Sequence, residues 1–383
     1  MDKAENQAAP AAKSPAGLEG VVAAQSSVGD VDGIRGVLIY QGINIHDLAE
    51  HSTFEETLFL LWHGRLPKRE ELDALRRELA ANQKVPAEVL ALMRQFPRDA
   101  EPMDALRTAI SALAFYDPQS RDLSREGALR TATKLTAQFP TVVAAIDRLR
   151  NGQEPVEPRE DLNIATNFLY MLKGEMPSER VARIFDVCLI LHADHELNAS
   201  TFTARVVAGT LADMYGAVTG AIAALSGPLH GGANTNAMKM VLEIGSPERA
   251  DEWLQDAFAK KKKIMGMGHR VYKTEDPRSV WLRKFSKEMG EAKGETRYFE
   301  ILERLREIVF REKKLYPNVD FYSGSAYYLM GIPLDLFTPI FAVSRISGWT
   351  AHVLEQYANN RLIRPRAEYT GGRDVPYVPI DER

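Results

Sequence analysis

The sequence predicts a mostly α-helical protein with two unequal domains. Its 383 residues are 45% hydrophobic and 26% charged, which is the mix of an ordinary globular chain. Beyond residue 51, apolar residues recur at spacings of three and four, as they do on the buried faces of helices. We recognise no alternation of strands with helices and no internal repeat, so a parallel-sheet fold and a solenoid are both disfavoured.

A change in composition predicts where the domains divide. A Gly- and Pro-rich stretch at 227–232 begins a segment of different character, and a second change follows about a hundred residues later. We therefore predict a small inserted domain over 227–326 and a large domain formed by 18–226 and 327–383. The Ala- and Pro-rich segment 1–17 is predicted to be a flexible tail.

Charge and composition exclude several classes of protein. Lys and Arg number 48 against 52 Asp and Glu, so the basic excess of a nucleic-acid-binding protein is missing. The single cysteine, Cys188, lies in an apolar run and is expected to be a small buried hydrophobe. We find no secretory signal and no apolar run long enough to span a membrane. We therefore expect a cytoplasmic protein with no membrane partner.

The first elements follow from turn and cap signals. A turn at 31–34 followed by the β-prone run 36–40 predicts a short hairpin. The spacing of Ser and Thr before Glu at 52–56 is that of a capping box, and Gly64 is placed to end the helix that follows.

Further helices are predicted by their first residues and by apolar stripes. Pro67, Pro102 and Ser178 are each placed to open a helix, and a stripe over 162–172 is closed by Gly174.

The segment 199–227 is rich in Ala, Gly, Ser and Thr and has few charges. Small side chains let helices approach closely, so we predict one buried central helix there, packed against another part of the chain or a second subunit. A helix is then predicted to begin at Ser246-Pro247. A charged amphipathic stretch follows over 281–316, and an apolar helical stretch over 333–358.

Two histidines, His192 and His195, lie three residues apart near the end of a predicted helix. Such a pair could bind a metal, but neither H-E-x-x-H nor H-x-x-E-H is present and the spacing supplies no third ligand. We therefore favour hydrogen-bonded histidines inside a helical bundle and predict no metal site.

Two further histidines lie in glycine-containing loops. His230 lies in a turn that lets a ligand approach the backbone, although a tight helix connection with an incidental histidine explains the turn equally well. His269 shares its loop with Arg270, Lys273 and Arg278, whose cations suit carboxylates or phosphates. The alternative is a solvated basic loop, which the flanking apolar residues make less favourable.

An acid and an arginine lie in apolar surroundings. Asp320 lies between Val and aromatic residues, where its pKa could rise as a general base requires, or it could cap a helix beginning near Tyr322. Arg345 lies in an apolar helix and needs an anionic partner, either a ligand or a structural acid. Together these groups predict an enzyme that acts on a small polyanion by acid–base chemistry without a metal.

Five strings in this order, HADHELNAST, GPLHGGAN, GMGHRVYKTEDPR, NVDFYSG and NRLIRPRAEYTG, resemble the citrate synthase family. The resemblance covers the chain from about Leu18 to its end, and the length resembles the short bacterial and archaeal form. It implies two unequal helical domains in a homodimer, with the active site in the cleft between them. It also implies that acetyl-CoA and oxaloacetate condense to citrate, the entry step of the tricarboxylic acid cycle.

The resemblance assigns a catalytic role to three residues. Asp320 would remove a proton from the acetyl methyl group, and His230 would hydrogen-bond the thioester oxygen as charge develops on it. His269 would polarise the ketone of oxaloacetate and donate a proton. No cofactor is implied, because acetyl-CoA is a substrate.

The resemblance also assigns residues that bind the substrates. Arg278 and Arg345 would hold the carboxylates of oxaloacetate beside His195, and Arg364 would come from the other subunit. Lys273 and Arg270 lie where the family binds the phosphates of CoA. Closure of the small domain over oxaloacetate would complete the acetyl-CoA site.

Two alternatives remain at this stage. A 2-methylcitrate synthase would use propionyl-CoA with the same residues, or one enzyme would accept both acyl-CoA substrates, but the 2-methylcitrate family commonly has Pro where this chain has Arg270. A non-catalytic helical interaction protein would have to explain why His230, His269 and Asp320 are all present in their motifs.

Overall fold

The computed structural model describes residues 16–18 and 20–383, so all but two residues of the predicted tail lie outside the described residues. The described chain is mostly α-helical, which confirms the predicted fold class. Its antiparallel sheet has the order β1 (Gly29–Asp32), β2 (Val37–Tyr40), β3 (Ile43–Asn44).

The α-helices are, in chain order, α1 (Ile45–His51), α2 (Phe54–His63), α3 (Arg69–Asn82), α4 (Ala87–Met93), α5 (Pro102–Leu113), α6 (Arg125–Arg150), α7 (Ile164–Lys173), α8 (Glu179–His192), α9 (Ala199–Ala208), α10 (Met214–Leu225), α11 (Ala233–Ile244), α12 (Ala250–Ala259), α13 (Pro277–Lys293), α14 (Arg297–Lys313), α15 (Val319–Leu329) and α16 (Phe337–Ala358).

Local signals in the sequence set many of these boundaries. Thr53 and Glu56 form the capping box that begins α2, and the side chain of Ser178 caps α8. Gly64 and Gly174 adopt left-handed conformations with φ of 73° and 77° where α2 and α7 end. Pro102 is the first residue of α5, as predicted.

The prediction of one central helix over 199–227 is wrong, because α9 and α10 divide this segment. Leu211 has a φ of 63°, and the Asp213 side chain accepts a hydrogen bond from Gly216 N at 2.9 Å, so a new helix begins. The stretch 281–316 likewise contains parts of two helices, separated at Gly294.

The sequence reasoning did not identify α1, α4, α6 or α11. In α6 nearly every residue from Thr131 to Asp147 is buried, and Pro140 lies inside the helix. A helix that is buried all round has no single apolar stripe, which removes the signal used to recognise helices.

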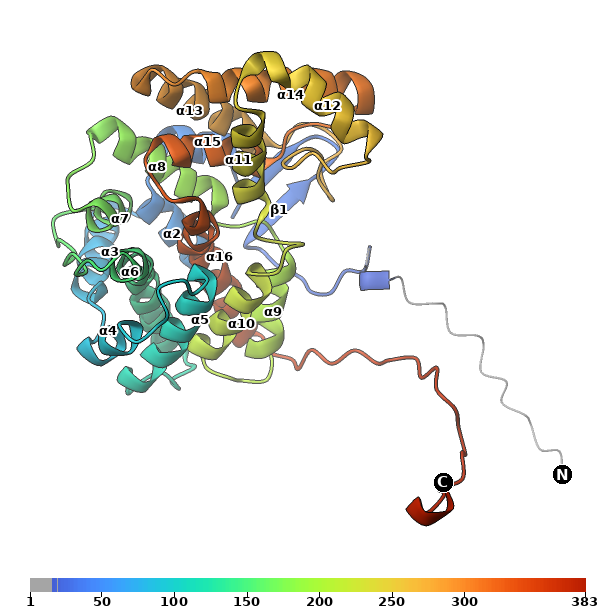
Figure 1. Ribbon diagram of the computed structural model, residues 1–383. Helices are drawn as coiled ribbons and strands as arrows, with labels where there is room; N and C mark the ends of the chain where they lie inside the picture. The colour runs from blue at the N-terminus through green and yellow to red at the C-terminus, as the bar shows by residue number, and fades with distance from the viewer. Residues whose placement is uncertain (1–15, 19) are drawn as a thin grey trace.

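Helix α16 passes through the middle of the helical body and packs against α6, α8, α9 and α10 (Figure 1). Helices α11 to α15 lie together at one end of the molecule, where α11 and α13 both pack against α15 (Figure 1). The predicted domain boundary at 326 falls inside α15, which continues to Leu329. The segment after α16 runs away from the body (Figure 1).

Two properties of residues 16–18 and 20–383 bear on function. No helix in this part of the chain is long and apolar enough to cross a membrane. No group of three or more His, Cys, Asp or Glu side chains within these ranges is placed to hold a metal ion.

A pair of buried carboxyl groups lies where α2 and α8 meet. Asp186 accepts a hydrogen bond from Phe54 N at 3.1 Å and pairs with Arg183 at 2.7 Å. Glu55 accepts a hydrogen bond from Ile164 N at 2.9 Å. Burial, and then the nearby charge of Glu55, raise the pKa of Asp186 to about 7.

This pair predicts how stability depends on pH. Between about pH 4 and pH 7 the native Asp186 holds a proton that the unfolded chain has released, so the free energy of unfolding should fall as pH rises. Glu55→Gln removes the neighbouring charge and should make this fall shallower. Urea unfolding at several pH values measures how the free energy of unfolding changes with pH. Glu70→Gln, on the exposed side of α3, is the control. An unchanged slope in Glu55→Gln would contradict the interpretation.

Candidate active site

The predicted site residues come from separate parts of the chain. His195 lies in the turn after α8, His230 in the turn between α10 and α11, and His269 in the loop between α12 and α13. Arg278 and Asp320 lie in the first turns of α13 and α15, and Arg345 lies in the middle of α16.

Rings from the α8 turn and the α12–α13 loop meet. The ring centroids of His195 and His269 are 5.3 Å apart, and Tyr272 lies against both of them. His195 Nε2 is 3.2 Å from the hydroxyl of Tyr272. Two histidines that are 74 residues apart in the sequence therefore lie against each other.

The loop that carries His269 is fixed to the start of α15. Asn318 caps this helix, donates its side-chain amide to Gly268 O at 2.7 Å, and donates its backbone N–H to Gly266 O at 2.9 Å. Gly266 has a φ of 77°, and a Cβ there would lie 2.6 Å from Phe321 Cα. This close approach requires glycine. It brings His269 and Asp320 to the same side of the molecule.

Arg278 is held by a residue of its own motif. Its Nε and Nη2 donate to the two carboxylate oxygens of Asp276 at 2.9 and 2.7 Å, and both side chains are buried. Asp276 Oδ2 also accepts a hydrogen bond from Val319 N at 3.1 Å. One carboxylate therefore fixes the Arg278 guanidinium relative to the helix that carries Asp320.

Arg345 has no such partner. Its side chain is 1% exposed, and its Nε donates to His192 O at 2.8 Å. No Asp or Glu among residues 16–18 and 20–383 forms a salt bridge with it, so the structural acid allowed by the sequence is not found. Burial lowers the pKa of Arg345 to about 10, which still leaves it charged at neutral pH.

The hydrogen bonds of His230 assign its proton. Its Nε2 accepts the backbone N–H of Ser200 at 3.3 Å and is 2.8 Å from the Ser200 hydroxyl, to which Trp349 donates its indole N–H at 3.0 Å. Since Nε2 accepts, Nδ1 carries the proton of the neutral ring. Burial, assisted by Arg345, lowers the pKa of His230 to about 4, so the ring is neutral at pH 7.

His269 has the opposite tautomer. Its Nδ1 accepts the backbone N–H groups of Val271 and Tyr272 at 3.0 and 3.2 Å, so Nε2 carries the proton. Burial and then Arg278 lower the pKa of His269 to about 4. The same two causes hold the pKa of His195 well below its usual range. The site therefore presents neutral imidazoles next to two arginines.

Asp320 is the titratable acid of the group. Burial raises the pKa of Asp320 to about 6, even though Arg278 opposes the rise. The helix begins at Val319 with Asn318 as its cap, so the alternative in which Asp320 caps a helix beginning near Tyr322 is wrong. A carboxyl group with this pKa is suited to accept a proton near neutral pH.

Three predicted residues lie on the surface. Arg270 and Lys273 are exposed, and Lys273 Nζ donates to Arg270 O at 3.2 Å beside the His269 loop. Arg364 is exposed in the segment after α16 that leaves the body, so its own chain does not bring it to the other candidates (Figure 1).

Known proteins are similar to this chain over nearly its whole length. The family model described as "Citrate synthase, C-terminal domain" matches residues 17–366. "Citrate synthase 2" of Bacillus subtilis is 54% identical over 368 residues, which cover 96% of this chain and 98% of that protein. The chain belongs to the citrate synthase family. It is therefore an acyltransferase of the citrate synthase type, and its relatives do not favour the 2-methylcitrate alternative.

Solved structures of citrate synthases have the same fold. The crystal structure of citrate synthase from Pyrobaculum aerophilum has a TM-score of 0.90 and 44% identity, covering 96% of this chain and 95% of that one. A Thermoplasma acidophilum citrate synthase, described as a ternary complex with carboxymethyl coenzyme A and oxaloacetate, has a TM-score of 0.91 and 34% identity, covering 96% and 98%.

Within this citrate synthase, the interpretation of the His192–His195 pair is confirmed for His192. Its Nδ1 donates to Cys188 O at 2.7 Å inside the bundle, and burial lowers the pKa of His192 to about 3. Cys188 is buried, as predicted.

Sequence reasoning missed the residues that hold the site residues in place, namely Asp194, Ser200, Tyr272, Asp276 and Trp349. One of them left a recognisable signal. Asp276 directly precedes Pro277 at the first position of α13, which is the pattern of a helix cap.

Proposed function

We propose that this citrate synthase condenses acetyl-CoA with oxaloacetate and water to citrate and CoA. The observation that carries the proposal is Arg345, a buried cation with no carboxylate partner among the described residues, near the buried Arg278. Two buried guanidinium groups next to neutral histidines suit a small dianion. The relative from Thermoplasma acidophilum, whose title names oxaloacetate, supports this choice of dianion.

The two carboxylates of oxaloacetate would bind Arg278 and Arg345, with His195 beside them. Since Asp276 takes up only Nε and Nη2 of Arg278, the remaining nitrogen can still donate to a ligand. Fixing both ends of the substrate would hold its ketone in one orientation for attack.

The acid–base steps would use the tautomers described above. The Asp320 carboxylate would take a proton from the methyl group of acetyl-CoA. The His230 Nδ1–H group would donate a hydrogen bond to the thioester oxygen, and the His269 Nε2–H group to the ketone oxygen, onto which it would transfer a proton as the carbon–carbon bond forms. Hydrolysis of the citryl thioester then releases CoA. No cofactor takes part in this proposal.

Other parts of the proposal concern assembly and the CoA moiety. In a homodimer, Arg364 would reach the oxaloacetate site of the partner subunit from the exposed segment after α16. Lys273 and Arg270, both exposed beside the His269 loop, would contact the phosphates of CoA. Closure of 227–326 over oxaloacetate would exclude water. The reaction would take place in the cytoplasm as a step of the tricarboxylic acid cycle.

Thiol release tests the activity directly. Adding oxaloacetate to the protein and acetyl-CoA should liberate CoA, and kcat/KM should be higher for acetyl-CoA than for propionyl-CoA. One methylene changes recognition by only about 1–3 kcal/mol, so some propionyl-CoA turnover is expected. No CoA release from either thioester would contradict the proposal.

The pKa of Asp320 predicts the pH dependence. Only the carboxylate form can accept a proton, so kcat/KM for acetyl-CoA should fall as pH drops below about 6. The expected slope is about tenfold per pH unit, as for a single protonation. A rate that stays constant between pH 7 and pH 5 would contradict the role of Asp320.

A further inference from the structure

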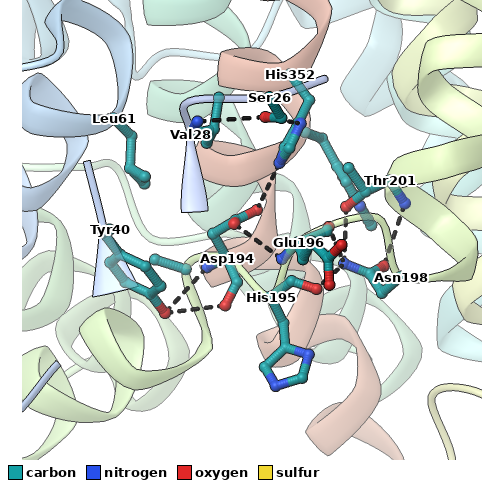
Figure 2. Close-up of polar contacts among 12 residues, drawn as sticks. Ser26, Val28, Tyr40, Leu61, Asp194, His195, Glu196, Asn198, Thr201 and His352 are labelled. Carbon is teal, nitrogen blue, oxygen red and sulfur yellow. Dashed lines mark hydrogen bonds and ion pairs between the residues drawn. The ribbon is translucent and has the colours of Figure 1, made fainter. Parts of the chain in front are cut away.

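The turn that carries His195 has an irregular backbone and is fixed from two sides. Glu196 has a φ of 52°, unusual for a residue other than glycine. On one side the buried Tyr40 hydroxyl accepts the N–H of Asp194 at 3.2 Å and lies 3.0 Å from its carbonyl oxygen (Figure 2). Helix α16 lies on the other side.

One stripe of α16 contacts three consecutive residues at the end of α8. Arg345 donates to His192 O, and Gly348 N donates to Ala193 O at 3.0 Å. His352 Nε2 lies 3.2 Å from Asp194 Oδ1. The spacing of 345, 348 and 352 keeps all three on one helix face. A Cβ at Gly348 would lie 2.5 Å from both Ala193 O and Asp194 Oδ1, so the approach requires glycine.

Asp194 and His352 are both completely buried, and Asp194 Oδ1 and His352 Nε2 lie within ion-pair distance at 3.2 Å, outside hydrogen-bond geometry (Figure 2). Neither of these two atoms has a hydrogen-bond partner in the part of the chain that the structure describes. Asp194 Oδ2 accepts the N–H of Glu196 at 3.1 Å. The carboxylate therefore bridges α16 and the residue directly after His195.

A neighbouring arginine assigns the proton of His352. Arg205 Nη1 lies 3.3 Å from His352 Nδ1, and an arginine can only donate, so Nδ1 accepts and Nε2 carries the proton toward Asp194. The same Arg205 nitrogen donates to Glu355 Oε2 at 2.5 Å. A continuous row of side chains, Glu355–Arg205–His352–Asp194, thus ends at the His195 turn.

Asp194 also acts on Arg345 through charge alone. Among the charges near Arg345, Asp194 contributes most to offsetting its burial. Asp194 Oδ2 accepts the N–H of Glu196 and Oδ1 lies beside His352, so the carboxylate stabilises the cation without forming a salt bridge with it. Nη1 and Nη2 of Arg345, which have no hydrogen-bond partner among the described residues, stay available for a substrate anion.

We propose that Asp194 and His352 are positioning residues for oxaloacetate binding: the pair locks the His195 turn onto α16 and thereby sets the distance between the His195 ring and the Arg345 guanidinium. This inference rests on the proposed function and adds two residues that do not touch the substrate. Displacing a binding group by about 1 Å can cost about 100-fold in catalysis, so a positioning pair has a large expected effect.

The test compares kinetics of Asp194→Asn, His352→Gln and the double variant. Each single variant should raise KM for oxaloacetate about 10- to 100-fold, while KM for acetyl-CoA at saturating oxaloacetate changes less than about threefold. Because the two side chains act as one unit, the double variant should be no worse than the more impaired single variant. Retention of the wild-type KM for oxaloacetate in His352→Gln, or full additivity in the double variant, would overturn the inference.

Asp186→Asn is the matched control, since it also alters a buried carboxylate at α8 but has no contact with the His195 turn. It should leave KM for oxaloacetate unchanged. If Asp194→Asn fails to fold, His352→Gln and calorimetric titration with oxaloacetate alone carry the test. A lowered Tm with unchanged oxaloacetate affinity would show a structural role and overturn the proposal. Failure of the wild type to release CoA would instead contradict the proposed function.

Discussion

Asp320→Asn is expected to lower kcat by about 10²–10⁴, the usual contribution of a general base. The amide is the same size as the carboxyl group but cannot take a proton from the acetyl methyl group. KM for oxaloacetate should stay within about threefold of the wild-type value, because Arg278 and Arg345 are untouched. Steady-state kinetics with each substrate varied separately measures both quantities.

The pH profile gives this experiment a second readout. The fall in rate below about pH 6 should disappear from whatever activity Asp320→Asn retains, because the titrating group is gone. Asp251 lies on α12 and pairs with Arg304 at the surface. Asp251→Asn is the control and should behave like the wild type. A kcat above about one tenth of the wild-type value in Asp320→Asn would rule out this carboxylate as the base.

Arg345→Met is expected to weaken oxaloacetate binding by about 100-fold or more, since hydrogen bonds to charged groups are worth about 1.5–3 kcal/mol each. Its effect on stability should have the opposite sign from that of most arginine substitutions. The free protein buries this cation without a carboxylate partner, so replacing it by an apolar side chain of similar length should leave Tm unchanged or raise it. Calorimetric titration and thermal unfolding measure the two effects.

Arg150→Met is the matched control for this pair of effects. Arg150 pairs with both Asp147 and Asp335, and these three side chains form no hydrogen bond or salt bridge with a site residue among the described residues. Its replacement should lower Tm and leave oxaloacetate binding unchanged. If Arg345→Met bound oxaloacetate within about threefold of the wild type, Arg345 would not be the anion-binding group that the proposal requires.

Residues with a local signature were predictable from the sequence. The capping box at Thr53, the caps at Ser178 and Gly64, and the helix opened by Pro102 are all set by hydrogen bonds within a few residues, and the structure confirms them. Helix α6 was not recognised because burial on all sides removed its amphipathic pattern.

The residues of the site likewise fall into two groups, those with a local signature in the sequence and those without one. His230, His269, Asp320, Arg278 and Arg345 were singled out because each is a reactive or charged residue in an apolar or glycine-rich setting. Their partners depend on contacts between distant segments, such as Ser200 with Trp349 and Asp194 with His352, which no local pattern encodes. That Arg345 forms no salt bridge with an Asp or Glu among the described residues became evident only from the structure.

A crystal structure of the protein with oxaloacetate and carboxymethyl coenzyme A would test the central claim most directly. We predict that one carboxylate of oxaloacetate accepts hydrogen bonds from the guanidinium of Arg345 and that the ketone oxygen lies within hydrogen-bonding distance of His269 Nε2. The carboxymethyl group should lie between His230 Nδ1 and Asp320. Oxaloacetate bound elsewhere, with Arg345 still free of any anion, would contradict the account.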